Sequence, residues 1–139
     1  MEDLQTMIVQ TAEAFRKNTG NQEDLDYSVK SLELLDILLE EGADFLPEEE
    51  QEGLVQMAGC YLFEVARRGF GGKYYWFSQG EQPVLVTGEP DFEVSILAFD
   101  KVKGRLQNGE EDNIPDYFEG YIEAVERGKS QKGYRSMIV

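Results

Sequence analysis

The sequence predicts an α+β fold in which about five helices pack on a small antiparallel sheet built on a hairpin. Apolar residues recur at helical spacing over most of the chain, and the period changes to alternation in one central stretch. Helices and strands also come in runs rather than in strict alternation. We expect a single domain over residues 1–128, because the chain of 139 residues has the usual length of a domain and no linker or internal repeat divides it.

Two amphipathic helices are expected in the first third of the chain. Apolar residues lie three and four apart from Leu4 to Lys17, and Asn18-Thr19-Gly20-Asn21 ends this helix. We expect Leu25-Asp26-Tyr27-Ser28 to be extended, with Ser28 capping a second helix that ends at Gly42. This second helix is apolar on more than one face, which is typical of a central helix.

A third helix and a hairpin should follow. Pro47 and the three glutamates after it predict a helix start, because proline suits the first helical position and carboxylates suit the positive helix end. This helix is expected to end at Gly69. After Gly71-Gly72, two alternating runs at residues 73–77 and 83–87 flank a loop that contains glycine, which predicts an antiparallel hairpin.

The remaining residues predict a short extended segment and two more helices. Residues 92–94 should be extended, and Ser95 should cap a fourth helix that carries Ile96 and ends at Asn108-Gly109. The acidic run at 110–112 is expected to be a solvated loop. Pro115 should begin the last helix, which ends at Gly128. Residues 129–139 form a basic tail, for which an extra strand and disorder are both open.

The composition excludes several classes of function. With 13 Lys+Arg against 28 Asp+Glu, the formal net charge is −15, and the chain has no histidine and one cysteine. The lack of histidine excludes Ser-His-Asp and Cys-His catalysis and any histidine-bound metal. A single cysteine excludes an intramolecular disulfide. We expect no enzyme activity, cofactor or metal, and no nucleic-acid partner, because an acidic surface repels phosphate.

The sequence also predicts where the protein resides. Its acidic start, Met1-Glu2-Asp3-Leu4, lacks the positively charged and apolar segments of a signal peptide. No window approaches the roughly 20 consecutive apolar residues that a membrane helix needs. The single cysteine suits a reducing compartment. We therefore expect a cytoplasmic protein with no membrane partner.

A mixed-charge cluster is the first candidate site, formed by Glu64, Arg67, Arg68 and Lys73. Residues 61–80 carry a net charge of +2 in an otherwise acidic chain. Glu64 and Arg68 are four residues apart in the stabilising order, which favours a surface ion pair on the helix. The alternative is a pocket for an anion or a carboxylate at the helix–hairpin junction, because arginine forks suit such ligands.

A run of aromatic residues is the second candidate site. Tyr74-Tyr75-Trp76-Phe77 places large side chains on both faces of a strand, because side chains alternate along it. Core packing on both faces is the favoured interpretation. The alternative is that one face covers the helices and the other, either Tyr74 with Trp76 or Tyr75 with Phe77, is exposed. Exposed aromatic patches are typical of binding surfaces, so Tyr75 and Trp76 are candidate residues for a partner surface.

Two short motifs resemble those of a known group of proteins. Tyr61-x-x-Glu64 precedes Gly71-Gly72-x-x-x-Trp76, and Leu25-Asp26-Tyr27-Ser28 stands upstream before a helix. This pattern resembles a family of small uncharacterised bacterial domains, over roughly residues 25–125. The resemblance implies no established activity. Some small acidic bacterial proteins of this general type are antidotes to toxins, which supplies a hypothesis.

The distribution of charge supports one functional hypothesis and leaves two others open. Residues 1–60 hold 3 basic and 15 acidic residues, a net charge of −12, and such a surface steers basic partners. We expect a non-catalytic acidic protein that binds a basic protein partner, for example as an immunity-type antidote. The alternatives are a stand-alone housekeeping or structural domain and a small-anion-binding domain at the helix–hairpin junction. The oligomeric state is left open.

Overall fold

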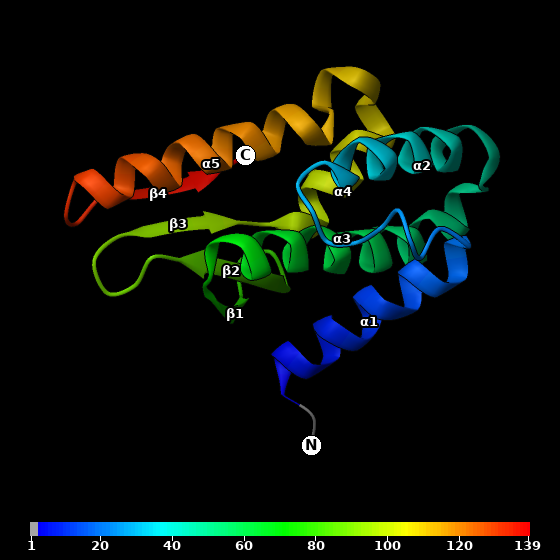
Figure 1. The fold of residues 1–139 in the computed structure, drawn as a ribbon. Coiled ribbons are helices and arrows are strands. Elements are labelled where there is room, and N and C mark those ends of the chain that lie inside the picture. Colours follow the sequence, from blue (N-terminus) through cyan, green and yellow to red (C-terminus); the bar gives the residue numbers. More distant parts are fainter. Residues whose placement is uncertain (1–2) are drawn as a thin grey trace.

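The structure is a computed structural model that describes residues 3–139 and confirms the α+β class (Figure 1). Within these residues the helices are α1 (Leu4–Thr19), α2 (Ser31–Phe45), α3 (Glu48–Phe70), α4 (Ala98–Asn108) and α5 (Ile114–Ser130). The strands are β1 (Lys73–Phe77), β2 (Gln82–Thr87), β3 (Glu93–Ile96) and β4 (Arg135–Ile138). Met1 and Glu2, part of the acidic start considered above, lie outside the described residues.

The four strands form one sheet in the order β1-β2-β3-β4. The pairs β1–β2 and β2–β3 are antiparallel, whereas β4 runs parallel to β3. Part of the basic tail is therefore a strand at the edge of the sheet, one of the two outcomes considered for it. The inner face carries a row of paired residues that all belong to the core or pack against it, namely Tyr74, Leu85, Ile96 and Ile138.

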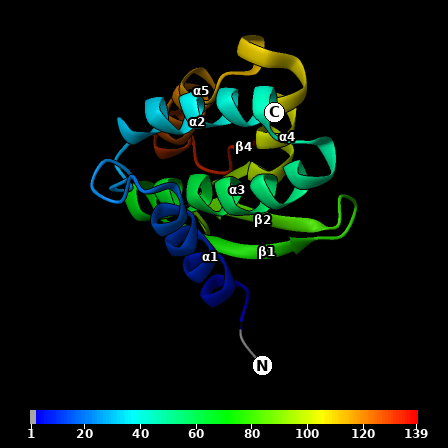
Figure 2. The ribbon, with the colours of Figure 1, turned by 90° about the vertical axis from the view of Figure 1, so that its right-hand side faces the viewer.

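Helix α3 is the centre of the helical layer. Every residue from Ala58 to Ala66 is buried, because α1 and α4 pack along this helix and α2 and β2 also contact it. Figure 2 shows α3 between α2 and the β1–β2 hairpin. Helix α5 packs against β3 and β4. No helix formed by residues 3–139 is both long enough and apolar enough to cross a membrane.

One buried cation joins three of the helices. Arg105 of α4 is only 1% exposed, and its Nε donates to Asp36 Oδ1 of α2 at 2.9 Å. The Nη2 atom lies 2.7 Å from Glu40 Oε2, also on α2. Asp36 Oδ1 accepts a further hydrogen bond from the backbone N–H of Ile114 at 2.9 Å, at the start of α5. The carboxylate of Asp36 thus fixes α2, α4 and α5 to one another.

Two local predictions are wrong near Ser95 and in the acidic run. Ser95 and Ile96 belong to β3 and not to the fourth helix, because Ile96 pairs with Leu85 on one side and with Ile138 on the other. Helix α4 begins only at Ala98. Residues Gly109–Asp112, expected as a loop, form the short 3-10 helix η1.

The sequence predicted an extended segment before α2, and this prediction is wrong. Tyr27 has a φ of 65°, in the left-handed region, and residues 26–27 form a bend. Ser28 Oγ does accept the backbone N–H of Ser31 at 3.1 Å, although the helix starts only at Ser31. Ser28 therefore caps the turn that precedes α2.

The turn between α3 and β1 depends on two glycines. Gly71 and Gly72 have φ values of 81° and 135°, which side chains rarely allow. A Cβ at Gly72 would lie 2.7 Å from the carbonyl oxygen of Val86. The hydroxyl of Thr87 donates to the Gly71 carbonyl at 2.8 Å, so the turn sits directly against β2. This close approach sets the distance between α3 and the sheet.

We predict that Gly72→Ala lowers the free energy of unfolding by about 2 kcal/mol, because it adds backbone strain and a steric clash. Gly69→Ala is the matched control, since nothing lies within 4 Å of its Cβ position at the end of α3. That change should be neutral or stabilise by up to about 1 kcal/mol. Urea denaturation followed by circular dichroism measures both variants, and equal stability of the two would contradict the prediction.

Candidate functional site

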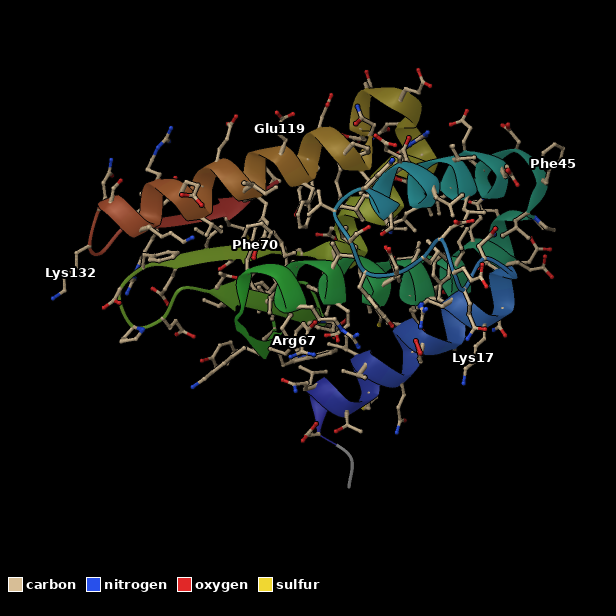
Figure 3. All side chains as sticks on the ribbon, viewed as in Figure 1. Lys17, Phe45, Arg67, Phe70, Glu119 and Lys132 are labelled. Carbon is tan, nitrogen blue, oxygen red and sulfur yellow. The ribbon has the colours of Figure 1, made fainter. Side chains whose placement is uncertain are left out.

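The predicted charge cluster is centred on a fully buried carboxylate. Glu64 of α3 is 0% exposed. Its Oε2 accepts hydrogen bonds from Arg67 Nε at 2.7 Å and from the hydroxyl of Tyr74 at 2.8 Å. Its Oε1 accepts from Arg67 Nη2 at 2.8 Å and from Arg68 Nε at 3.0 Å. The Glu64–Arg68 ion pair favoured from the sequence does form. Its placement on the surface is wrong, because the carboxylate of Glu64 lies inside the protein. Figure 3 shows Arg67 between α3 and α1.

These hydrogen bonds keep Glu64 ionised. Burial alone would raise the pKa of its carboxyl, but the hydrogen bonds from Arg67, Tyr74 and Arg68 outweigh burial and lower the pKa below its ordinary value of 4.5. Burial, together with the charge of Glu64, raises the pKa of the Tyr74 phenol, which therefore remains a neutral donor. Glu64 is thus a saturated acceptor whose environment opposes the proton uptake that acid–base chemistry requires.

The two motifs that carry the family resemblance meet at this cluster. The guanidinium carbon of Arg68 lies 3.8 Å from the centre of the Tyr27 ring, and Tyr27 stacks on Tyr61 with ring centres 5.0 Å apart. The oxygen of Tyr61 accepts the backbone N–H of Tyr27 at 3.0 Å and lies 2.6 Å from Ser31 Oγ. These residues hold the segment before α2 against α3, which gives them a structural role.

The other predicted site residues do not join the cluster. Lys73 precedes Tyr74 on β1, so its side chain points to the opposite face of the sheet. Among the residues that the structure describes, Lys73 forms no ion pair. Tyr75 shares that face, is 43% exposed, and donates its hydroxyl to Glu89 Oε1 at 2.8 Å.

Trp76 lies on the same face of β1 as Tyr74. It is 58% exposed. Core packing on both faces of this strand, the interpretation favoured from the sequence, is therefore wrong. The two most exposed aromatic side chains of β1, Tyr75 and Trp76, point to opposite faces and do not form one continuous patch.

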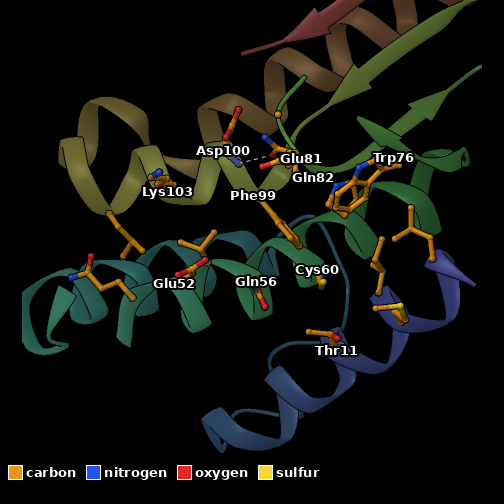
Figure 4. Close-up of a pocket in the computed structure, with 18 of the residues that line it drawn as sticks. Thr11, Glu52, Gln56, Cys60, Trp76, Glu81, Gln82, Phe99, Asp100 and Lys103 are labelled. Carbon is orange, nitrogen blue, oxygen red and sulfur yellow. Dashed lines mark hydrogen bonds between the residues drawn. The ribbon is translucent and has the colours of Figure 1, made fainter. Parts of the chain in front are cut away.

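Trp76 instead stands at one end of a large groove (Figure 4). The groove has a volume of about 820 Å³ and lies between α1, α3, α4 and the turn that joins β1 to β2. Apolar side chains make up much of its wall, and two of them are large and exposed: Met7 of α1 at 50% and Trp76. The other apolar lining residues are Leu4, Ile8, Val55, Cys60, Pro83, Phe99 and Leu106.

Carboxylates surround this apolar surface. Glu48 and Glu52 of α3, Glu81 of the β1–β2 turn and Asp100 of α4 all line the groove and are exposed. Lys103 is the one basic residue among the described residues that line it. Within residues 3–139, none of the four carboxylates takes part in an ion pair. The groove thus combines an apolar interior with uncompensated negative charge.

Cys60 lines the groove and contributes apolar surface rather than a reactive thiol. Burial is the main reason that the pKa of its thiol rises to about 12, and the negative charge of Glu64 adds to the effect. The thiol is therefore protonated at neutral pH, and a protonated thiol is a poor nucleophile. Cys60 is 4% exposed and therefore acts as a small buried apolar residue.

Sequence reasoning identified only Trp76 among the groove residues. The groove is assembled from segments that are far apart in the sequence, and no local motif joins Met7, Glu52 and Phe99. The sequence alone contains no signal for this: Met7 belongs to the apolar stripe of α1, and only the structure shows that its side chain is 50% exposed.

Comparison of the chain with protein-family models, curated proteins and solved structures gives no significant match. The resemblance to small bacterial domains therefore stays a prediction from the motifs.

We predict that Glu64→Gln lowers the free energy of unfolding by about 3 kcal/mol at pH 7, because it leaves two partly buried arginines without their counter-charge. The folded-state pKa of Glu64 is depressed, so its contribution is fully present above the unfolded pKa, near 4.5, and is lost as pH falls through the lower folded-state value. The stability difference between wild type and variant should therefore shrink below about pH 4.5.

Urea denaturation at pH 7, 5 and 3.5 measures this difference. The exposed Glu119→Gln on α5 is the control, and it should change stability by less than about 0.5 kcal/mol at each pH. A Glu64→Gln effect that is equally large at pH 7 and 3.5 would show that the charge of Glu64 is not what stabilises the fold.

Proposed function

We propose that this chain is a non-catalytic acidic protein of the bacterial cytoplasm that binds a basic protein partner. The groove carries this proposal, because its apolar wall and its unpaired carboxylates are together what a positively charged protein segment requires. Its partner-facing residues include Trp76, and aromatic side chains of this kind are enriched where proteins bind one another.

The charge of the surrounding surface supports the same proposal. Residues 1–60, which form α1, α2 and the first half of α3, carry a net charge of −12. A field of this sign attracts a basic protein over distances comparable to the Debye length, roughly 8 Å at physiological salt, and raises the association rate. The apolar wall then supplies the contact that holds the partner in place.

A toxin antidote is one form of this function, since an acidic protein of this kind would cover the cationic active site of a toxin. The free Cys60 supports a cytoplasmic location, because it has no second cysteine with which to form a disulfide. The anion-binding alternative has less support, because Arg67 and Arg68 already donate to Glu64.

To test the proposal, the full chain is immobilised and used to capture proteins from its source cell at low salt, and each candidate is then purified and measured by calorimetry. We expect a basic protein whose affinity falls at least roughly tenfold between about 50 and 500 mM NaCl, because screening weakens charge attraction.

An unrelated acidic protein of similar size and net charge serves as the control bait. A partner that binds both baits equally well responds to charge alone. Recovery of only such partners, or of none that is basic, would contradict the proposed function.

A further inference from the structure

We propose that the groove binds an amphipathic, basic α helix of the partner protein, laid along α3 between α1 and α4. This inference rests on the proposed function, because it names the segment of the partner and the place where that segment lies. It is argued from the shape of the groove, from its apolar wall and from the position of its charges.

The shape of the groove favours a helix. The α3 residues that line it recur at intervals of three and four along one face, from Glu48 to Cys60. These twelve residue steps correspond to roughly 18 Å at 1.5 Å per residue. Since α1 and α4 both pack on α3 and both line the groove, the space between them has the form of a vacant helix position.

The backbone of the ligand supplies a second argument. An extended segment would bury N–H and C=O groups that need partners, and surrounding helices offer no strand edge to pair with them. Of the sheet, only Trp76 of β1 and Gln82 and Pro83 of β2 line the groove, and β2 is already paired with β1 and β3. A helix satisfies its own backbone hydrogen bonds, so its transfer from water into the groove costs less free energy than that of an extended segment.

The apolar wall shows what the buried face of this helix would present. Trp76, Phe99 and Met7 come from three different elements and line the groove together with Cys60 of α3. Figure 4 shows Trp76, Phe99 and Cys60 among the lining side chains. A helix bound in such a groove places large apolar residues at positions i, i+3, i+4 and i+7. We therefore expect leucine-sized or aromatic residues at this spacing.

The carboxylates define the flanks of the bound helix. Glu52 lies on α3, whereas Glu81 and Asp100 lie on the opposite side of the apolar wall, in the turn and on α4. Negative charge on both sides selects lysine or arginine on both edges of the apolar stripe. It also rejects an acidic amphipathic helix of the same shape, because like charges would face each other.

Tryptophan fluorescence can report on binding in this groove. Trp76 is the only tryptophan, so its emission reports directly on the groove. The probe is a peptide of about 14 leucines and lysines arranged at helical period, titrated into the full chain. Two control peptides have the same leucines with glutamate in place of lysine, and the same composition in strictly alternating order.

Two charge-matched double variants separate the groove from general attraction. Glu52→Lys with Glu81→Lys changes the groove, whereas Glu119→Lys with Glu123→Lys makes the same change of net charge on exposed residues of α5, which contributes no described residue to the groove. We expect the helical lysine peptide to shift the Trp76 emission. The groove variant should weaken its binding by roughly tenfold or more, and the α5 variant by less than about threefold.

Each other result overturns the inference in a different way. If both variants weaken binding equally, the peptide is held by overall charge and not by the groove, and the proposed function then depends on the capture experiment alone. If the alternating or glutamate peptide binds as well as the helical lysine peptide, the partner segment is not a basic helix. If no peptide binds but a basic protein is captured as above, the partner binds elsewhere; if neither binds, the proposed function fails as well.

Discussion

The fold depends on a buried negative charge that must be fully paired. A carboxylate that is removed from water is strongly destabilising unless donors surround it, and Glu64 meets this condition with Arg67, Arg68 and Tyr74. Two of these donors link α3 to other segments: Tyr74 brings β1 onto α3, and Arg68, held by Glu64, lies over Tyr27 before α2. One side chain therefore determines how the sheet and the N-terminal segments are placed against the central helix.

A second buried charge applies the same constraint on the other side of the molecule. Arg105 is paired by Asp36 and Glu40, and Asp36 also holds the start of α5. Glu64 and its donors thus order the surroundings of the C-terminal half of α3, while Arg105 ties α4 to α2. Because α1 and α4 both pack against α3, the groove between them is lined by ordered helices and is formed before any partner arrives.

Local sequence patterns predicted the helices and strands better than they predicted the tertiary contacts of those elements. Periodicity found the five α-helices of the described residues and the β1–β2 hairpin, because each depends on residues near in sequence. It failed at Ile96, where pairing with Leu85 and Ile138 overrides helical spacing, and at Glu64, where i,i+4 spacing does not reveal that residues 58–66 are buried on all sides. The backbone bends at Tyr27 for a similar reason, because its N–H donates to the hydroxyl oxygen of Tyr61, which is distant in the sequence. The groove joins four separate segments and has no local signature.

The unpaired carboxylates around the groove tie stability to binding. Glu64 and Asp36 are paired with arginines, whereas Glu48, Glu52, Glu81 and Asp100 line an apolar groove in which Lys103 is the one basic residue among the described lining residues. Like charges repel, and an apolar wall left in water gains nothing from burial, so both features destabilise the free protein slightly. A basic amphipathic segment would remove both effects at once. The chain thus provides counter-charges for the buried Glu64 and Arg105 but not for these four carboxylates, and under the proposed function a basic partner would supply them.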